Sequence, residues 1–135
     1  MNQNNRINSE TAKVLVADDT VSIRKILKSM LKEMGFKNII EAADGTQTMK
    51  MIDLQAFHLI LCDWEMPGYK GDEILKSVRM SEKNNNSIFI MCTGNNNPES
   101  VKNAISLGVT NFIIKPFNQN IIFGKLEKYF KLSQF

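Results

Sequence analysis

Five polar residues stand at the ends of short apolar runs, and their types suit the chemistry of a phosphoryl group. They are Asp18, Asp19, Asp63, Thr93 and Lys115. Three carboxylates brought close together would repel one another unless a cation lay between them. Magnesium fits better than calcium, because the carboxylates are few and the sequence has no calcium-loop spacing. Lysine and threonine side chains can each bind a phosphoryl oxygen, and Asp63 would accept the group as an acyl phosphate.

Each of these residues also has an ordinary structural interpretation. An Asp-Asp pair can cap a helix, Thr93 can cap a turn, and Lys115 can be a solvated charge at the end of a strand. Those interpretations are favoured for any one residue alone. They fail for the set, since chance would have to place all five side chains at four strand ends in a workable order.

The elements that would position these residues alternate regularly along the chain. The run Val14-Leu15-Val16-Ala17 reads as a buried strand, and the stretch from Ile23 to Gly35 has its apolar residues at helical spacing. The same alternation follows with strands around 39–40, 58–62, 87–92 and 111–114. Five such units predict an α/β fold, a parallel sheet with helices on both faces. The carboxyl ends of its strands lie along one edge, where the five polar side chains should form a cleft.

Composition limits the classes of function that remain. The chain has 135 residues, of which 43% are hydrophobic, which is enough for one buried core. A formal charge of +3 is too small to indicate a nucleic-acid partner. No apolar stretch is long enough for a membrane span or a secretory signal, so we expect a cytoplasmic protein without membrane insertion. Residues 1–12 are polar and predict a loosely ordered tail before a single domain over 13–135.

The order Asp18-Asp19, Asp63, Thr93 and Lys115-Pro116 resembles the receiver domain of two-component response regulators, especially the single-domain, CheY-like chemotaxis regulators. The supporting motifs are Val-Leu-Val-Ala-Asp18-Asp19, Asp63-Trp64-Glu65-Met66-Pro67 with Gly71 after it, and Gly108-Val-Thr-Asn-Phe-Ile-Ile-Lys115-Pro116-Phe117. The resemblance covers roughly residues 13–130, and we expect no output domain after it. It implies a flavodoxin-like, doubly wound sheet of five strands in the order 2-1-3-4-5.

The resemblance also implies a role for each site residue. Asp63 would be phosphorylated by a CheA-like histidine kinase or a small phosphodonor, and the protein would catalyse only its own phosphorylation and dephosphorylation. Asp19, Asp63 and the backbone carbonyl of Glu65 would ligate Mg²⁺, while Asp18 would act through a water. Lys115 would hold the phosphoryl group, and the bond from Lys115 to Pro116 would be cis.

The same resemblance implies a switch. Thr93 would move to bond the new phosphate, and Phe112 would turn inward behind it. This change would alter the surface of the fourth helix, the fifth strand and the fifth helix, the last with Ile122, Leu126 and Phe130 at helical spacing. A monomer would then bind a target such as a flagellar motor switch protein, and a phosphatase would be a further partner.

Three positions depart from the usual chemotaxis pattern. Glu65 stands where relatives usually carry Asn, and Asn95 stands where an acid is common. Both positions flank the phosphoryl group in the family, so we hypothesise that dephosphorylation differs from the family's usual rate. Phe112 replaces the commoner Tyr, which removes a hydroxyl from the output face, and a plain core aromatic is the alternative interpretation.

Other functions would use the same cleft. A phosphorelay shuttle or a phosphate sink needs the same residues as motor control. A small Mg²⁺-dependent phosphohydrolase with an aspartyl phosphate is the rival from another class, since such enzymes generally carry a second acid where Glu65 stands. The combination of Asp18-Asp19 with Lys115-Pro116 favours the receiver, and we expect no substrate-capping domain.

Overall fold

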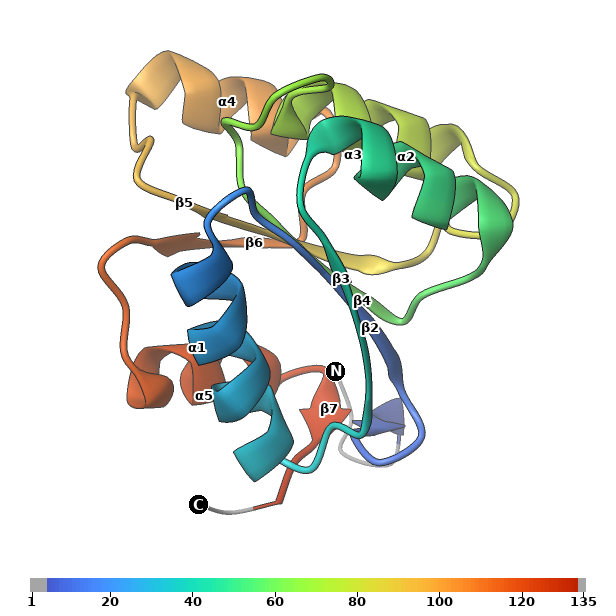
Figure 1. Cartoon of the computed structure of the whole chain (residues 1–135), viewed down its shortest axis with the longest axis vertical. Coiled ribbons are helices and arrows are strands. Elements are labelled where there is room, and N and C mark those ends of the chain that lie inside the picture. Colours follow the sequence, from blue (N-terminus) through green and yellow to red (C-terminus); the bar gives the residue numbers. More distant parts are fainter. Residues whose placement is uncertain (1–4, 134–135) are drawn as a thin grey trace.

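Five parallel strands form the central sheet, in the spatial order β3-β2-β4-β5-β6 (Figure 1). The computed structural model describes residues 5–133. The strands are β2 (Lys13–Ala17), β3 (Asn38–Ala42), β4 (Leu59–Cys62), β5 (Ile88–Thr93) and β6 (Asn111–Ile114). Every neighbouring pair in this sheet runs parallel. Counted over these five strands, the order is 2-1-3-4-5, so the predicted flavodoxin-like topology is confirmed.

Five helices cover the sheet on both faces (Figure 1). On one face lie α1 (Val21–Glu33) and α5 (Gln119–Leu126), and on the other lie α2 (Gly45–Leu54), α3 (Gly71–Met80) and α4 (Pro98–Ser106). Asn97 caps α4 by accepting a hydrogen bond from the Glu99 N–H, with Pro98 as the first helical residue. None of the helices within residues 5–133 is long and apolar enough to cross a membrane.

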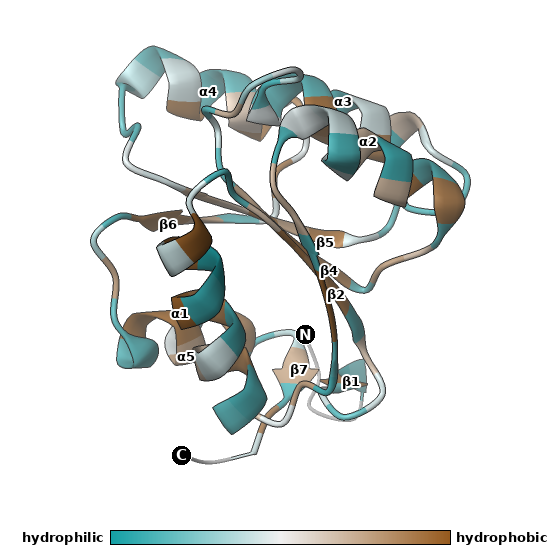
Figure 2. Ribbon diagram, viewed as in Figure 1, coloured by the Kyte–Doolittle hydropathy of each residue, from teal (hydrophilic) through white to brown (hydrophobic). Residues whose placement is uncertain are grey.

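The central strands are apolar throughout because helices bury both of their faces. Val14 and Val16 of β2 pack in the cluster under α1 and α5, while Leu15 and Ala17 pack in the cluster under the other three helices. The hydrophobic colours in Figure 2 follow these strands. Continuous burial of this kind is typical of parallel sheets and produces strands without polar alternation. The sheet is therefore a rigid support for the loops that follow its strands.

The two cysteines are buried and free, as their apolar surroundings predict. Cys62 belongs to the core cluster on one face of the sheet and Cys92 to the cluster on the other, so their side chains lie on opposite faces. Burial raises the pKa of both thiols, that of Cys92 to about 12. Neither thiol is therefore ionised near neutral pH.

The expectation of a loose tail over residues 1–12 is wrong for its second half. Residues 1–4 lie outside the described part of the chain, but β1 (Ile7–Asn8) pairs in parallel with β7 (Phe130–Lys131). Two backbone hydrogen bonds extend this pair, from Ile7 N–H to Tyr129 O at 3.0 Å and from Ser9 N–H to Lys131 O at 3.1 Å. Pairing with a distant segment leaves no periodic signal in so short a strand, which explains the error.

The C-terminal segment corrects a second expectation. Helix α5 ends at Leu126, so Phe130 lies in β7 and not in the last helix. Its ring is fully buried and meets the ring of Phe36 edge to face, with the centroids 5.2 Å apart. Close by, the carbonyl oxygen of Met34 accepts hydrogen bonds from Ser9 Oγ at 3.1 Å and from Ser133 N–H at 2.8 Å. Segments from both ends of the domain thus donate hydrogen bonds to a carbonyl oxygen at the C-terminal end of α1.

Truncation of Phe130 tests this placement. We expect Phe130→Ala to lower the free energy of unfolding by about 3–5 kcal/mol, because it removes a fully buried ring and leaves a cavity. Ile121→Ala is the matched control on α5, where the side chain is 43% exposed and the expected loss is within about 0.5 kcal/mol. Urea unfolding of both variants measures the difference. Equal losses would contradict the burial of Phe130 by this strand pair.

Candidate functional site

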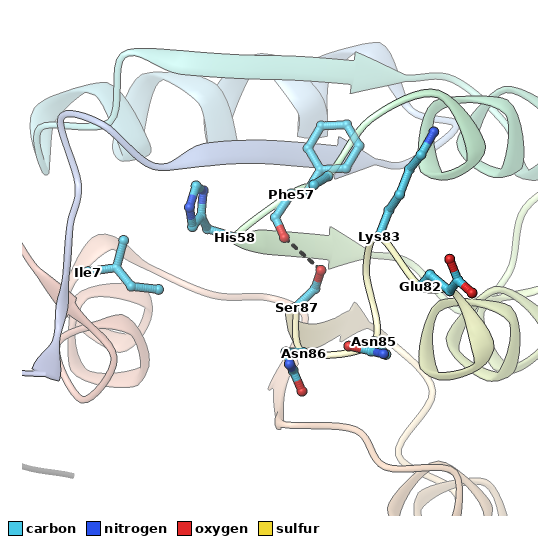
Figure 3. Close-up of a pocket in the computed structure, with 9 residues that line it drawn as sticks. Ile7, Phe57, His58, Glu82, Lys83, Asn85, Asn86 and Ser87 are labelled. Carbon is cyan, nitrogen blue, oxygen red and sulfur yellow. Dashed lines mark hydrogen bonds between the residues drawn. The ribbon is translucent and has the colours of Figure 1, made fainter.

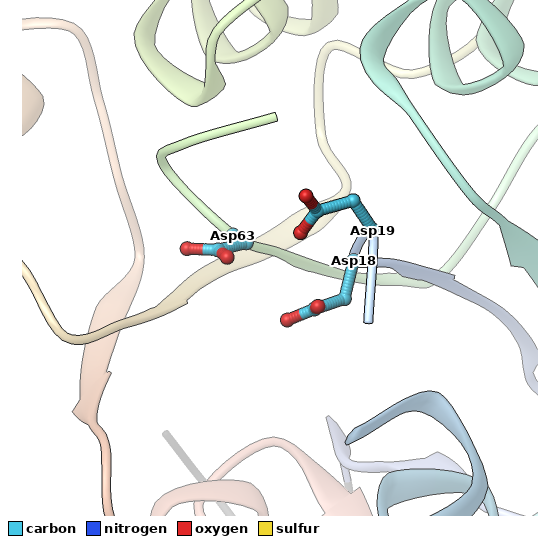
Figure 4. A group of neighbouring side chains, drawn as sticks. All are labelled: Asp18, Asp19 and Asp63. Atoms are coloured by element: carbon cyan, nitrogen blue, oxygen red, sulfur yellow. The ribbon is translucent and has the colours of Figure 1, made fainter. Parts of the chain in front are cut away.

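The structure brings together the three aspartates that the sequence places at strand ends. Asp18 and Asp19 follow β2, and Asp63 follows β4, its immediate neighbour in the sheet. One carboxylate oxygen from each lies within 4.8 Å of the others (Figure 4). The Asp63 N–H donates to Ala17 O at 2.9 Å, which continues the ladder between the two strands and fixes their relative register. The parallel ladder is thus what aligns the carboxylates.

Lys115 joins this group from the strand at the sheet's edge. Its ammonium lies 2.7 Å from Asp18 Oδ2 and 3.2 Å from Asp63 Oδ2. The backbone N–H of Lys115 donates to Thr93 O at 2.9 Å, and the peptide bond from Lys115 to Pro116 is cis. Burial alone would lower the pKa of Lys115, but the hydrogen bond to Asp18 and the charges of Asp63 and Asp18 outweigh it, so this pKa is raised. Titration of Lys115 therefore weakens the pairs only above the ordinary lysine pKa of about 10.4.

The burial of the two paired aspartates makes this charge balance important. The exposed fraction is 1% for Asp18 and 8% for Asp63, whereas Asp19 is exposed. Within residues 5–133, Lys115 is the one cation that forms an ion pair with these carboxylates. Three carboxylates and one ammonium leave a net charge of about −2. The side-chain atoms of the three aspartates that could bind a metal are all oxygens. A hard divalent cation fits both properties.

Thr93 ends β5, the strand next to β4, which Asp63 follows, and is 1% exposed. Its hydroxyl oxygen accepts a hydrogen bond from the Asn95 N–H at 3.1 Å. The Asn95 side chain points along the loop, since its Nδ2 lies 3.3 Å from Ser100 Oγ and its Oδ1 accepts from the Asn97 N–H at 3.1 Å. Thr93 is therefore linked through one residue to the start of α4, and the Asn95 amide is engaged within that link.

The loop after Asp63 is held at two points. Gly45 N–H donates to Pro67 O, and Gly71 N–H donates to Trp64 O, each at 2.8 Å. A Cβ at Gly71 would lie 2.8 Å from Asp63 O, so this position excludes any side chain. Glu65, on this loop, has a side chain 61% exposed and lies 3.5 Å from the ammonium of Lys70. Its carboxylate is thus at the surface beside the cluster and does not enter it.

Phe112 lies in the middle of β6, opposite Met91 of β5, and is half-buried against the core under α4. Three exposed isoleucines mark the neighbouring surface, one each on α4, β6 and α5. They are Ile105, Ile114 and Ile121, with exposed fractions of 63%, 38% and 43%. Each of these three elements therefore presents an apolar side chain to solvent.

A separate cavity of about 370 Å³ lies at the opposite, amino-terminal end of the strands, and Ile7, Phe57, His58 and Ser87 line it (Figure 3). His58 Nδ1 accepts a hydrogen bond from the Lys13 N–H at 2.9 Å, and Ser87 Oγ donates to Phe57 O at 2.6 Å. Both polar side chains thus hold backbone segments together, which is a structural role.

Sequence reasoning missed Arg24, which reaches this site from α1. Its Nη1 donates to the carbonyl oxygen of Asp18 at 2.6 Å, and its Nε lies 3.2 Å from Glu41 Oε1. The contact with Asp18 is to the backbone, which no side-chain pattern reveals. The acidic site therefore has a basic partner that the spacing of motifs cannot identify.

Comparisons with known proteins agree with this architecture. The family profile described as response regulator receiver domain matches residues 14–127, and the chain belongs to this family. Within it the chain is CheY-like: it is 34% identical over 119 residues to the chemotaxis protein CheY of Pseudomonas aeruginosa, covering 88% of this chain and 96% of that protein. It is likewise 34% identical to CheY-3 of Vibrio cholerae, over 91% of this chain and 95% of the relative.

The solved structures include a similarly related protein. The chemotaxis response regulator CheY4 of Vibrio cholerae superimposes with a TM-score of 0.80 at 31% identity, covering 87% of this chain and 98% of the other. Both strands of the β1–β7 pair lie outside the residues that the family profile matches. The chain is thus a CheY-like receiver, and the strand pair lies beyond the segment that the profile matches.

Removal of the ammonium tests the charge balance of the site. We expect Lys115→Met to lower the free energy of unfolding in metal-free buffer by about 1–3 kcal/mol, because Asp18 and Asp63 then face each other without a counter-charge. Asp18→Asn in the same chain should recover part of the loss, giving a coupling energy of at least about 1 kcal/mol in a double-mutant cycle. Urea unfolding measures all four proteins.

Lys125→Met is the matched control for this cycle. Lys125 lies on α5 and bonds Asn111 Oδ1 at 3.3 Å, away from the carboxylates, so it should show no coupling to Asp18. Additive losses for Lys115→Met and Asp18→Asn would show that their ion pair does not contribute to the folded state.

Proposed function

We propose that this response regulator is a phosphoacceptor of a chemotaxis system, in which Asp63 takes a phosphoryl group from a histidine kinase in a Mg²⁺-dependent reaction. The observation that carries the proposal is the cluster of Asp18, Asp19 and Asp63 with a single ammonium, at the carboxyl edge of a doubly wound sheet. This edge is where ligands bind in such folds. The chemotaxis role is supported by the relatives, which are named as chemotaxis proteins and are matched over 95–96% of their length.

The donor set fits a bound Mg²⁺ ion. Asp19, Asp63 and the backbone carbonyl of Glu65 would hold it, and Asp18 would act through a water, consistent with its side chain being occupied by Lys115 and by the Thr20 N–H. When bound, the metal supplies positive charge between the acceptor carboxylate and the phosphoryl oxygens. This charge offsets the excess of about −2 that the protein's own residues leave.

The chain's own residues account for the rest of the transfer. A carboxylate oxygen of Asp63 forms a bond to phosphorus while the bond from phosphorus to the donor's histidine nitrogen breaks, which yields an acyl phosphate and leaves the electron pair on the nitrogen. Lys115, now 3.2 Å from Asp63 Oδ2, would pair with a phosphoryl oxygen instead. Thr93 would donate its hydroxyl to another, and the link through Asn95 would carry that change to α4.

The proposed output is the surface of α4, β6 and α5. Its exposed isoleucines Ile105, Ile114 and Ile121 offer apolar contacts to a partner, and Phe112, on the same strand as Ile114, is half-buried against the core. A flagellar motor switch protein is the target we propose, with a phosphorelay shuttle or phosphate sink as the competing roles. Binding of the phosphorylated protein to a motor-switch peptide would support the first, and transfer from Asp63 onto a histidine phosphotransfer domain would support the second.

Incubation with Mg²⁺ and acetyl phosphate tests the acceptor. We expect one phosphate per protein, stable in acid and labile in base, because an acyl phosphate forms on Asp63. Asp63→Asn should abolish it, whereas Asp53→Asn, which alters an exposed aspartate of α2, should not. Mass spectrometry counts the phosphates. Sustained turnover of phosphate esters without this single adduct would indicate a phosphohydrolase instead.

The exchanged polarities at Glu65 and Asn95 predict an altered phosphoryl lifetime. We expect the double variant Glu65→Asn, Asn95→Glu to differ from the native protein by roughly threefold or more, a change of about 0.7 kcal/mol in the barrier. The physical reason is that both positions flank the phosphoryl group in the receiver family, so exchanging a carboxylate and an amide there changes the charge beside it. Decay of the ³²P-labelled protein measures the lifetime, and equal lifetimes would refute the hypothesis.

A further inference from the structure

Arg24 connects three elements around the acidic cluster. It is the fourth residue of α1, and its side chain is only 12% exposed. The guanidinium donates from Nη1 to Asp18 O at 2.6 Å, in the loop after β2, and its Nε lies 3.2 Å from Glu41 Oε1 on β3. Two separate nitrogens of one rigid, planar group thus have separate acceptors, an arrangement that a lysine cannot reproduce.

The bond to Asp18 completes the fixation of that residue. Asp18 N–H donates to Ala42 O at 3.1 Å, Oδ1 accepts from Thr20 N–H at 2.9 Å, and Oδ2 accepts from Lys115 at 2.7 Å. The remaining backbone acceptor is the carbonyl oxygen, which Arg24 takes. Because a peptide unit is planar, holding this oxygen fixes the whole plane between Asp18 and Asp19. That plane sets the direction in which the exposed Asp19 side chain leaves the backbone.

Glu41 fixes Arg24 in turn. It lies on β3 opposite Val16 of β2, so its backbone belongs to the same ladder that carries Asp18. Its second carboxylate oxygen lies 3.4 Å from the ammonium of Lys28, one turn further along α1. Glu41 on β3 therefore restrains the guanidinium through Nε. This restraint keeps Nη1 directed at Asp18 O.

We propose that Arg24 is a positioning residue for the metal site, which holds the peptide between Asp18 and Asp19 so that Asp19 meets Mg²⁺ in a productive geometry. The inference rests on the proposed function, since it assigns a role toward the metal proposed there. Magnesium demands a nearly ideal octahedron, and groups that orient its ligands typically change its affinity by 10-fold or more. Arg24 has no carboxylate of the cluster as a partner, so its effect passes through the backbone.

Charge and position predict opposite signs for the loss of Arg24. A positive group close to the site repels an incoming cation, so removing the charge alone would tighten Mg²⁺ binding. Removing a group that holds a ligand in place would weaken it. The direction of the change therefore separates a positioning role from a merely electrostatic one.

Titration of the metal-free protein with Mg²⁺ decides between them. Trp64, the one tryptophan, is next to Asp63 and provides a fluorescence readout, and calorimetry provides a second. We expect the Kd for Mg²⁺ to rise about 10-fold in Arg24→Met and a few-fold in Arg24→Lys, which keeps the charge but loses the fork. Lys28→Met is the matched control: it removes a charge from the same helix and the same Glu41 partner without touching Asp18, and its Kd should stay level or fall.

Two outcomes would overturn the proposal. One is an Arg24→Met variant that binds Mg²⁺ as tightly as the native protein or more tightly, and the other is Arg24→Lys with an unchanged Kd. Arg24→Lys keeps the positive charge, so a rise in its Kd cannot be electrostatic, and this variant carries the same test should Arg24→Met not fold. A native protein that binds no Mg²⁺ would refute the proposed function as well, whereas native binding with unaffected Arg24 variants would refute this inference alone.

Discussion

The mutual repulsion of three carboxylates at one edge of the sheet is the constraint on which this structure depends. Asp18 and Asp63 are almost fully buried, so neither can rely on water to screen its charge. The counter-charge comes from Lys115, 97 residues further along the chain than Asp18. Correct strand order is therefore a condition for a stable site, because only adjacent placement of β2, β4 and β5, with β6 at the edge, brings the ammonium to both carboxylates. Fold and charge balance thus require each other.

The core explains how the fold meets this condition. Val14 and Val16 of β2 pack in one core cluster and Leu15 and Ala17 in the other, so a shift of this strand by one residue would exchange its side chains between the two faces. The register that buries Val16 and Leu61 is also the register that places Asp18 beside Asp63. Apolar packing thereby supplies the rigidity that lets buried charges remain close together, and Arg24 and Lys115 hold the loop after β2 from the backbone side and the side-chain side respectively.

The sequence predicts much of this because its strongest signals are local. Short apolar runs followed by helical spacing identify five units, and a polar residue at the end of a run is visible without a structure. The strand order rests on the resemblance, since the pattern of apolar residues contains no information on it.

Two features of the structure could not be predicted from the sequence. The β1–β7 pair depends on contacts between segments over 120 residues apart and gives no periodicity, and Arg24 acts on a carbonyl oxygen, which every residue possesses.

The distribution of anchors over the two sides of the sheet indicates where the proposed phosphorylation-driven movement would be least costly. Helix α1 buries Leu27 and Leu31, and its end is tied to Ser9 and Ser133, while the β1–β7 pair closes the far end of α5. Helix α4, by contrast, has Ala104 as its single fully buried residue and exposes Ile105. Segments with few buried apolar contacts have the lowest free energy of local displacement. If Thr93 moves as proposed, α4 is therefore the helix that should follow it, while α1 and the loop after β2 stay in place.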